Sequence, residues 1–279
     1  WFTKVITLSF LLIFVGEVSC VDIPCIFQND VFGRYVCGIA QQIQPLTSPN
    51  DPIVITTQHN VGRTDNNVQG VLASFNPKFV FFPTNLFTVF PNLIYVIFQI
   101  TGITTMTTNA FANCANLQNI TLNFNGFPTL PASFASTCTN VRFLNLDING
   151  IVSVDRNAFA GLTNLQSISL ARNNFTSLDP ATFVNTPNLR TLDVSRGFLI
   201  SIDTALFSTL SNLVTLNFAT NPITTLPALV FGSTASLTSI SFQNNLINFV
   251  DRNLFVNNPT IGSSTTPINL QNNVCVNTL

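Results

Sequence analysis

The residue types that carry out chemistry in proteins are scarce in this chain. Its 279 residues include 10 Lys and Arg, 11 Asp and Glu, and one histidine, His59. That histidine stands in a polar stretch, residues 56–62, without a nearby cysteine nucleophile or second histidine. A solvated loop histidine is therefore favoured over a catalytic or metal-binding one. So few acids, bases and ligands argue against an enzyme, and predict neither a cofactor nor a metal site.

A row of aspartates is the one acidic pattern. Asp155, Asp179, Asp203 and Asp251 each stand four residues before a phenylalanine. One interpretation is a calcium site. The other is that each carboxylate caps a short helical turn that directs the phenylalanine inward. We favour caps, because stacked aspartates alone lack the clustered oxygen ligands that calcium takes.

The formal net charge of −1 also argues against nucleic acid as a partner.

The start of the chain has the order of a secretory signal. Lys4 precedes an apolar run, residues 5–15, which is followed by residues 16–20 with Cys20 at the end. We expect residues 1–20 to be a signal peptide cleaved after Cys20. An uncleaved signal anchor is the alternative, but the run is shorter than the roughly 20 residues of a membrane span. No later stretch reaches that length, so the chain is expected to be secreted, with its remaining cysteines oxidised.

The body of the chain repeats every 24 residues. The first apolar position of each unit is occupied by Leu93, Leu117, Val141, Leu165, Leu189, Leu213 and Leu237. Further apolar positions follow three and five residues later, and each unit closes on a phenylalanine, from Phe111 to Phe255. A pattern held at several positions over seven units predicts a solenoid, in which stacked units share the core that one unit could not bury.

The pattern L-x-x-L-x-L-x-x-N-x-I-x-x-L-x-x-x-x-F resembles the extracellular 24-residue form of the leucine-rich repeat (LRR) family, and residues 165–173 are its clearest copy. The resemblance implies an LRR solenoid, a curved α/β-type horseshoe. Its parallel β-sheet lies on the concave face, and turns and helical turns lie on the convex side. About eight repeats are expected over residues 69–260, with the first unit aligned so that Leu72 corresponds to Val96. Residues 21–68 form an N-terminal cap, and residues 261–279 a degenerate last repeat and the start of a C-terminal cap.

The asparagines of the repeat are expected to form a structural ladder. Their amides can bond the backbone groups left open where the chain turns inward. The ladder consists of Asn125, Asn149, Asn173, Asn221 and Asn245. Thr101 and Gly197 occupy the same position in their units, and we expect a looser backbone there.

The resemblance also suggests how the cysteines pair. Extracellular members carry a cysteine-stapled N-terminal flank, which pairs Cys25 with Cys37. Cys114 and Cys138 lie one repeat apart, and equivalent sites on adjacent turns can meet the Cα distance that a disulfide needs. Cys275 is left over, with its partner expected beyond Leu279.

With the chemistry of enzymes set aside, the outward side of the concave sheet is the candidate binding surface. Large apolar groups gather on its N-terminal half, and a few charges stand in an otherwise neutral field. The residues expected to bind are Tyr95, Ile97, Gln99, Phe124, Phe143, Asp147, Arg172, Asp193 and Arg196. Sequons at Asn119 and Asn174 are possible glycosylation sites, and a glycan on Asn119 would obstruct the sheet.

The predicted function is non-catalytic recognition of a protein ligand or co-receptor by a secreted protein, with a glycan as the other candidate partner. The chain resembles the small secreted leucine-rich-repeat proteins of insects, and the family serves in adhesion and innate immune recognition. One alternative is the ectodomain of a membrane-bound receptor whose span lies downstream. A second is an ice- or glycan-binding surface built on the hydroxyl rows of the sheet, including Ser167, Ser169 and Thr191.

Overall fold

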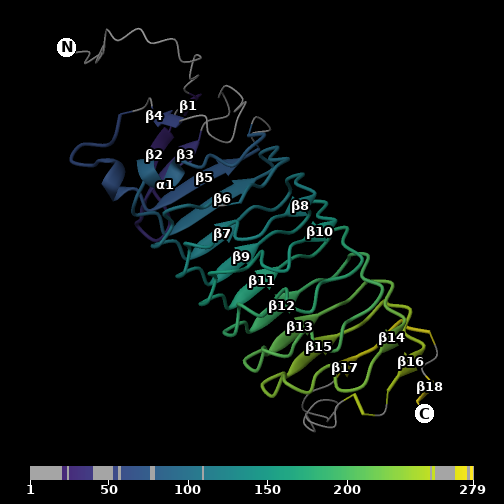
Figure 1. Ribbon diagram of the computed structural model, residues 1–279. Helices are drawn as coiled ribbons and strands as arrows, with labels where there is room; N and C mark the ends of the chain where they lie inside the picture. The colour runs from purple at the N-terminus through teal and green to yellow at the C-terminus, as the bar shows by residue number, and fades with distance from the viewer. Residues whose placement is uncertain are drawn as a thin grey trace.

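The computed structural model describes residues 21–23, 25–39, 53–55, 58–75, 79–108, 110–251, 253–254, 268–274 and 277–278. The expected signal peptide, Phe255 and Cys275, whose partner was expected beyond Leu279, lie outside these residues. The described chain forms an elongated solenoid of stacked turns, whose first and last strands lie at opposite ends (Figure 1). Helix in the described residues is confined to α1 (Leu86–Val89) and a single 3-10 turn (Asp65–Asn67), and no described helix could cross a membrane.

One eleven-stranded sheet runs the length of the solenoid. Each repeat gives it one short strand, and these strands pair in parallel, as the repeat predicted, whereas the first two strands, from the cap, pair antiparallel. In spatial order from the N-terminal end the strands are β2 (Cys25–Asn29), β3 (Tyr35–Ile39), β5 (Gly70–Ser74), β6 (Tyr95–Gln99), β7 (Asn119–Thr121), β9 (Phe143–Asn145), β11 (Ser167–Ser169), β12 (Thr191–Asp193), β13 (Thr215–Asn217), β15 (Ser239–Ser241) and β17 (Ile268–Asn269).

Small sheets complete the turns. The strand pair β1 (Val21–Ile23) and β4 (Ile53–Ile55) lies near the N-terminal end. On the side opposite the main sheet, β8 (Thr129–Leu130) pairs with β10 (Ser153–Val154), and β14 (Thr225–Leu226) and β18 (Asn277–Thr278) flank β16 (Phe249–Val250). Turns rather than helices make up most of this opposite side.

Side chains of the main sheet alternate between the core and solvent, because successive residues of a strand point to opposite faces. In β11, Ile168 is buried while Ser167 and Ser169 face outward. We call the outward side of the eleven-stranded sheet the sheet face. The closing phenylalanines fill the interior from the other side and are fully buried, for example Phe159 and Phe183, whose rings stack at 5.7 Å.

The first repeat is one residue longer than expected. Val71 of β5 pairs with Val96 of β6, and Ala73 pairs with Phe98. The alignment of Leu72 with Val96 is therefore wrong. Since a slip of one residue exchanges the two faces of a strand, Leu72 points to the sheet face beside Ile97 instead of into the core. The aromatic residues Phe79, Phe82 and Phe87 of this unit are buried.

The asparagine ladder is present and carries backbone hydrogen bonds between turns. Asn173 is a representative rung: its Oδ1 accepts from the backbone N–H groups of Asn149 (3.1 Å) and Ile151 (3.0 Å). Its Nδ2 donates to the carbonyls of Leu146 (3.0 Å) and Leu170 (2.9 Å). Asn125, Asn149, Asn221 and Asn245 make corresponding bonds, and Asn273 extends the ladder after a unit that is four residues longer.

The two interruptions of the ladder differ. Thr101 is fully buried, and both its backbone N–H and its hydroxyl donate to Oδ1 of Asn125. The next rung therefore holds the backbone at Thr101, against the expectation of a looser one. At Gly197 an added Cβ would lie 3.1 Å from Oδ1 of Asn221, so the neighbouring turn packs closely against it. A looser backbone at Gly197 stays a prediction.

The aspartate row forms capping turns. Oδ1 of Asp155 accepts from the backbone N–H of Asn157 at 2.7 Å, and Asp179, Asp203 and Asp251 repeat this bond two residues on. Each turn leads into a closing phenylalanine where that residue is described.

The cysteines pair as expected, Cys25 with Cys37 and Cys114 with Cys138.

Candidate binding surface

The sheet face holds the residues expected to bind, with one correction. Phe124 and Phe143 are exposed, Ile97, Gln99, Asp147 and Asp193 are partly buried, and Arg172 and Arg196 are exposed. Tyr95, however, is only 6% exposed. The prediction that its ring faces water is wrong, because the hairpin formed by β2 and β3 packs against it.

The hairpin is fixed to the sheet by one carboxylate. Oδ1 of Asp30 accepts the backbone N–H groups of Phe32 and Arg34, both at 2.9 Å, which shapes the turn between the two strands. Its Oδ2 accepts Nε of Arg34 at 2.7 Å and the hydroxyl of Tyr95 at 2.8 Å. Asp30 therefore joins the tip of the hairpin to the first full repeat.

Gly70 makes this contact possible. It pairs with Tyr95 across β5 and β6, and a Cβ at Gly70 would lie 2.3 Å from Cζ of the tyrosine ring. The ring thus lies over the glycine and reaches past β5 toward the hairpin. No other residue type leaves room for it there.

The network shifts the pKa values of both groups. Burial alone would raise the pKa of the Asp30 carboxyl, but hydrogen bonds from the Arg34 backbone, the Tyr95 hydroxyl, the Phe32 backbone and the Arg34 side chain lower it to about 2. Burial, followed by the hydrogen bond to the Asp30 carboxylate, raises the pKa of Tyr95 above its ordinary value. At neutral pH the pair is a carboxylate and a phenol that donates to it.

A cleft lies between the hairpin tip and the first strands of the sheet face, and we call it the hairpin cleft. Its volume is about 510 Å³. The hairpin contributes Gln28, Asn29, Asp30, Val31, Phe32 and Arg34, and the sheet contributes Leu72, Tyr95, Ile97, Asn119 and Thr121. Three of the residues expected from the sequence, Tyr95, Ile97 and Asn119, are thereby brought together with a hairpin that no repeat pattern describes.

A second feature is the row of residues one to three positions after the end of each strand, which we call the strand-end row. They adopt left-handed backbone angles, with φ near +55° to +61°, although none is glycine. The row changes in chemistry along the solenoid, from apolar Phe75, Ile100, Phe124 and Ile148 to basic Arg172 and Arg196, and then to polar Thr220, Asn244 and Asn272.

The strand-end row is held in place by the turn that follows. The backbone N–H of Phe124 donates to the carbonyl of Asp147 (3.0 Å), and that of Arg172 donates to the carbonyl of Ser195 (2.9 Å). Such non-glycine residues persist in a left-handed conformation because the surrounding hydrogen bonds determine it. Their side chains are therefore presented from a fixed backbone.

Two aspartates stand in the middle of the sheet face. Oδ1 of Asp147 accepts from the Ser169 hydroxyl and from the backbone N–H of Ala171. Burial raises the pKa of Asp147, as does the charge of Asp193, while the hydrogen bonds from Ser169 and Ala171 and the charge of Arg172 oppose the rise. Asp193 and Arg172 are close enough to act on the charge of Asp147, but no ion pair joins these charged groups among the described residues.

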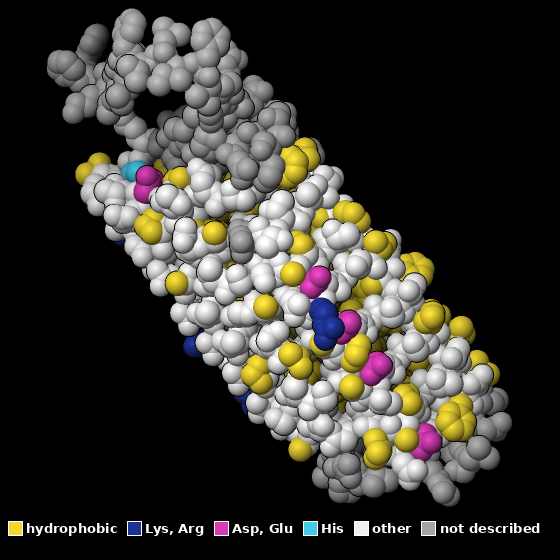
Figure 2. Space-filling view, in the orientation of Figure 1, with side chains coloured by type: hydrophobic (Ala, Val, Ile, Leu, Met, Phe, Trp, Pro, Cys, Tyr) yellow, Lys and Arg dark blue, Asp and Glu magenta, His cyan; other side chains and the backbone are white. Residues whose placement is uncertain are grey.

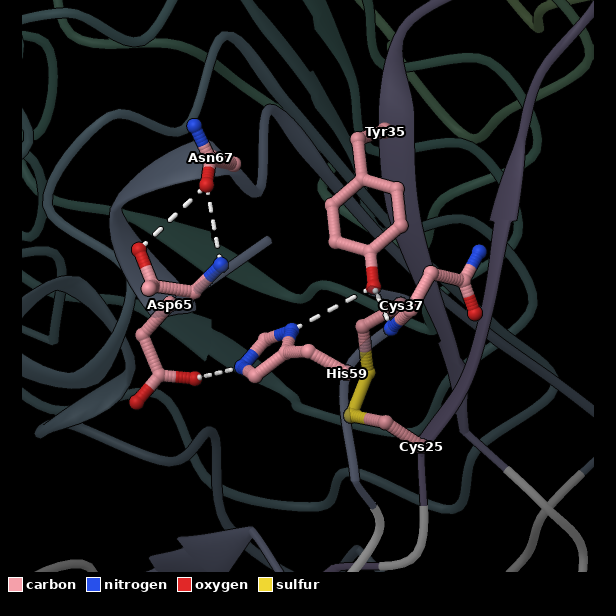
Figure 3. Close-up of polar contacts among 8 residues, drawn as sticks. Cys25, Tyr35, Cys37, His59, Asp65 and Asn67 are labelled. Atoms are coloured by element: carbon pink, nitrogen blue, oxygen red, sulfur yellow. Dashed lines mark hydrogen bonds and ion pairs between the residues drawn. A yellow bond between two sulfur atoms is a disulfide. The ribbon is translucent and has the colours of Figure 1, made fainter. Parts of the chain in front are cut away.

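The lone histidine belongs to the cap and is not the solvated loop residue expected from the sequence (Figure 3). The Nε2 atom of His59 lies 2.7 Å from the Asp65 carboxylate, and its Nδ1 lies 3.3 Å from the Tyr35 hydroxyl. The imidazole also packs on Phe27, with ring centroids 4.0 Å apart. Because all three partners belong to the cap, the geometry supports a structural role beside the Cys25–Cys37 disulfide.

The described surface is poor in charged side chains. Within the described residues, no three acidic, histidine or cysteine side chains gather as a metal site would require. On the face shown in Figure 2, hydrophobic side chains are scattered among neutral polar side chains and exposed backbone, and charged side chains are few.

Sequence reasoning missed several functional candidates. Asp30, Arg34 and Leu72 line the hairpin cleft, yet the hairpin lies outside the repeat, and the longer first unit hid the orientation of Leu72.

A second row of asparagines was also overlooked. Each member precedes the first apolar residue of a unit, and most donate to a carbonyl of the preceding turn: Asn92, Asn116, Asn140, Asn164, Asn188 and Asn212. Its regular Asn-Leu or Asn-Val pairs could have revealed it.

Comparison with known families agrees with this architecture. A model of the leucine rich repeat matches residues 139–196 and 187–247, and a model of the BspA type leucine rich repeat region (6 copies) matches residues 73–149. The chain belongs to the leucine-rich repeat proteins. No curated protein matches its sequence significantly.

Solved structures share the fold at low sequence identity. The TLR13–ssRNA13 complex is 21% identical, with a TM-score of 0.67 over 71% of this chain and 28% of the other. A leucine-rich repeat protein of Leptospira interrogans is 21% identical, with a TM-score of 0.63 over 75% of this chain and 50% of the other. The LRIM1/APL1C complex gives 17% identity and a TM-score of 0.62 over 92% and 52%. The chain thus spans no more than about half the length of these proteins.

Proposed function

We propose that this protein is a secreted, non-catalytic recognition protein that binds another protein through the N-terminal half of its sheet face. The observation that carries the proposal is the fixed, partly apolar surface formed by the hairpin cleft and the strand-end row. Phe143 is 50% exposed at the centre of a parallel sheet, where water rather than a neighbouring element covers it. Exposed aromatic groups on a rigid scaffold are the usual anchors of protein interfaces.

The charge pattern supports a protein rather than a nucleic acid. The formal net charge is −1, and Arg172 acts on the charge of Asp147 together with Asp193, so basic and acidic groups are mixed rather than gathered in a basic field. Such a mixed pattern gives orientation to a protein partner. Among similar structures, TLR13 is seen with RNA and LRIM1 with APL1C, so the fold itself accommodates different partners.

Secretion and glycosylation form part of the proposal. Two disulfides within the described chain suit an oxidising compartment. Asn174 is exposed, and a glycan there would leave the sheet face open, since this residue follows the asparagine ladder at the turn. Asn119 lines the hairpin cleft, so a glycan on it would obstruct the surface proposed to bind.

The test is an interaction screen against a library of extracellular proteins, followed by affinity measurements on each captured partner. Phe143→Ser should weaken binding at least tenfold, because it removes a central apolar contact. Phe198→Ser is the matched control: Phe198 is 55% exposed but lies in the turn after the strand-end row. Equal loss in both variants, or loss only in Phe198→Ser, would refute binding through the sheet face.

A further inference from the structure

We propose that the hairpin cleft is an acceptor site for a carboxylate of the partner, a Glu or Asp side chain next to an apolar residue. This inference rests on the proposed function and assigns a chemistry to one end of the same surface. Arg34 provides the charge, and Leu72 and Ile97 provide the apolar wall.

Arg34 is held ready for an anion. Its guanidinium carbon lies 4.7 Å from the centroid of the Phe32 ring and 4.4 Å from that of Tyr95, so both rings contact the group. Its Nε is bonded to Asp30, and its terminal nitrogens make no hydrogen bond to any described residue. The side chain remains 28% exposed. An arginine fixed by aromatic rings loses little freedom when a carboxylate binds to its open nitrogens.

Asp30 is not available to bind a cation in the hairpin cleft. Its two oxygens already accept four hydrogen bonds, from the backbone of Phe32, from the backbone and side chain of Arg34, and from Tyr95. A lysine or arginine of the partner would have to displace one of these donors. The hydrogen bonds still to be made at this charged pair are therefore those that the terminal nitrogens of Arg34 can donate. Such donors favour an anionic group.

The surroundings favour a carboxylate on a polypeptide rather than a free ion. Phe32 is 77% exposed at the hairpin tip, and Leu72 and Ile97 lie side by side on adjacent strands. The amides of Gln28, Asn29 and Asn119 also line the cleft and could bond a peptide backbone. An apolar side chain next to the carboxylate would cover the apolar wall and exclude water from the ion pair.

The chain offers a direct readout, since it has only two tyrosines, Tyr35 and Tyr95. Ring-13C-labelled tyrosine in the whole protein gives one set of NMR signals from the cleft and one from the cap. The probe is the peptide acetyl-Leu-Phe-Glu-Leu-amide, and its control is the same peptide with Gln in place of Glu. We expect the Glu peptide to shift the Tyr95 signals saturably, and the Gln peptide to bind about tenfold more weakly, because a hydrogen bond to a charged group is stronger than one to a neutral amide.

A pair of arginine variants completes the experiment. Arg34→Gln should reduce the affinity for the Glu peptide about tenfold. Arg63→Gln is the control, because Arg63 contacts the ring of Tyr35, at 5.3 Å, and lies outside the hairpin cleft. Equal binding of the two peptides to the wild-type protein would overturn the proposal, even if Arg34→Gln failed to fold.

Failure of the carboxylate site and failure of the proposed function give different results. Captured partners that depend on Phe143 while the peptides bind equally would leave sheet-face recognition standing and reject the carboxylate site. Selective binding of the Glu peptide, with no partner weakened by Phe143→Ser, would support the carboxylate site and reject the proposed function. Peptide-induced shifts confined to Tyr35 would also reject the cleft.

Discussion

At the scale of residues, a single glycine and a single carboxylate shape the N-terminal end of the surface. Gly70 gives the Tyr95 ring a place to lie, and Asp30 holds the ring and Arg34 together. Without either residue the hairpin would lose its only described side-chain hydrogen bond to β6. The hairpin cleft is therefore a product of a few specific contacts rather than of the repeat.

Gly70→Ala should disturb this arrangement. The added methyl group would overlap the Tyr95 ring and force it away from Asp30, at a cost of about 1–3 kcal/mol in the free energy of unfolding. Gly126→Ala is the control, since the nearest atom to its added Cβ is 3.8 Å away. Urea unfolding measures both. Equal stability of Gly70→Ala and wild type would show that the ring does not occupy this position.

Two aspartates should respond to pH in opposite ways. The folded-state pKa of Asp30 is about 2, below the ordinary 3.8, so its stabilising effect is present above pH 4 and is lost as the pH falls through about 2. Asp30→Asn should therefore be less stable than wild type at neutral pH, with the difference shrinking over that range.

Asp147 has a raised pKa, so ionising it costs stability at neutral pH. Asp147→Asn keeps an oxygen for the bonds from Ser169 and Ala171 and should be at least as stable as wild type at pH 7. Any gain should disappear below the ordinary pKa of 3.8, where the carboxyl is protonated in both states. Unfolding curves between pH 2.5 and 7 test both aspartates; a loss of stability in Asp147→Asn at pH 7 would contradict the burial assigned to it.

At the scale of elements, stability comes from rungs that join one turn to the next. Asn173 satisfies two N–H groups and two carbonyls that would otherwise be buried without partners. The ladder was predictable because its asparagines recur at one position of the repeat. The way in which Thr101 takes the place of an asparagine was not predictable, because it depends on a hydroxyl that reaches the next rung.

Asn173→Ala should lower the free energy of unfolding by about 3 kcal/mol or more, since each unsatisfied buried group costs ~1–3 kcal/mol. Asn174→Ala is the adjacent control: its side chain is exposed, and it should change stability by less than about 0.5 kcal/mol. Guanidinium unfolding of the two variants, made without glycans, gives the comparison. Equal effects would contradict the ladder as a source of stability.

The sequence predicted a cysteine-stapled segment before the repeats, but not where the hairpin would lie. The pairing of Cys25 with Cys37 was expected from the resemblance, but the sequence contains nothing periodic that places the turn over Tyr95. Replacing both cysteines by serine should cost about 3 kcal/mol locally and release the hairpin. Hydrogen exchange should then increase in β2 and β3 while β11 to β13 keep their protection; a uniform change along the solenoid would contradict a separate cap.

At the scale of the whole molecule, the periodic part of the sequence predicted the fold, since each unit repeats the same inward and outward positions. The binding surface was predicted only in part. The outward position of Phe143 follows from strand alternation, whereas the exposure of Phe124 depends on its left-handed backbone, and the covering of Tyr95 on contacts between residues 65 apart in the chain. Contacts of that kind arise from how the cap folds back, which no local pattern encodes.

The most direct test of the central claim is hydroxyl-radical footprinting of the whole protein with and without a captured partner. Phenylalanine side chains react when water reaches them, and the chain carries exposed examples on and off the sheet face. We predict that Phe124 and Phe143 lose reactivity in the complex while Phe198 keeps it. Protection of Phe198 with unchanged Phe124 and Phe143 would contradict recognition through the sheet face.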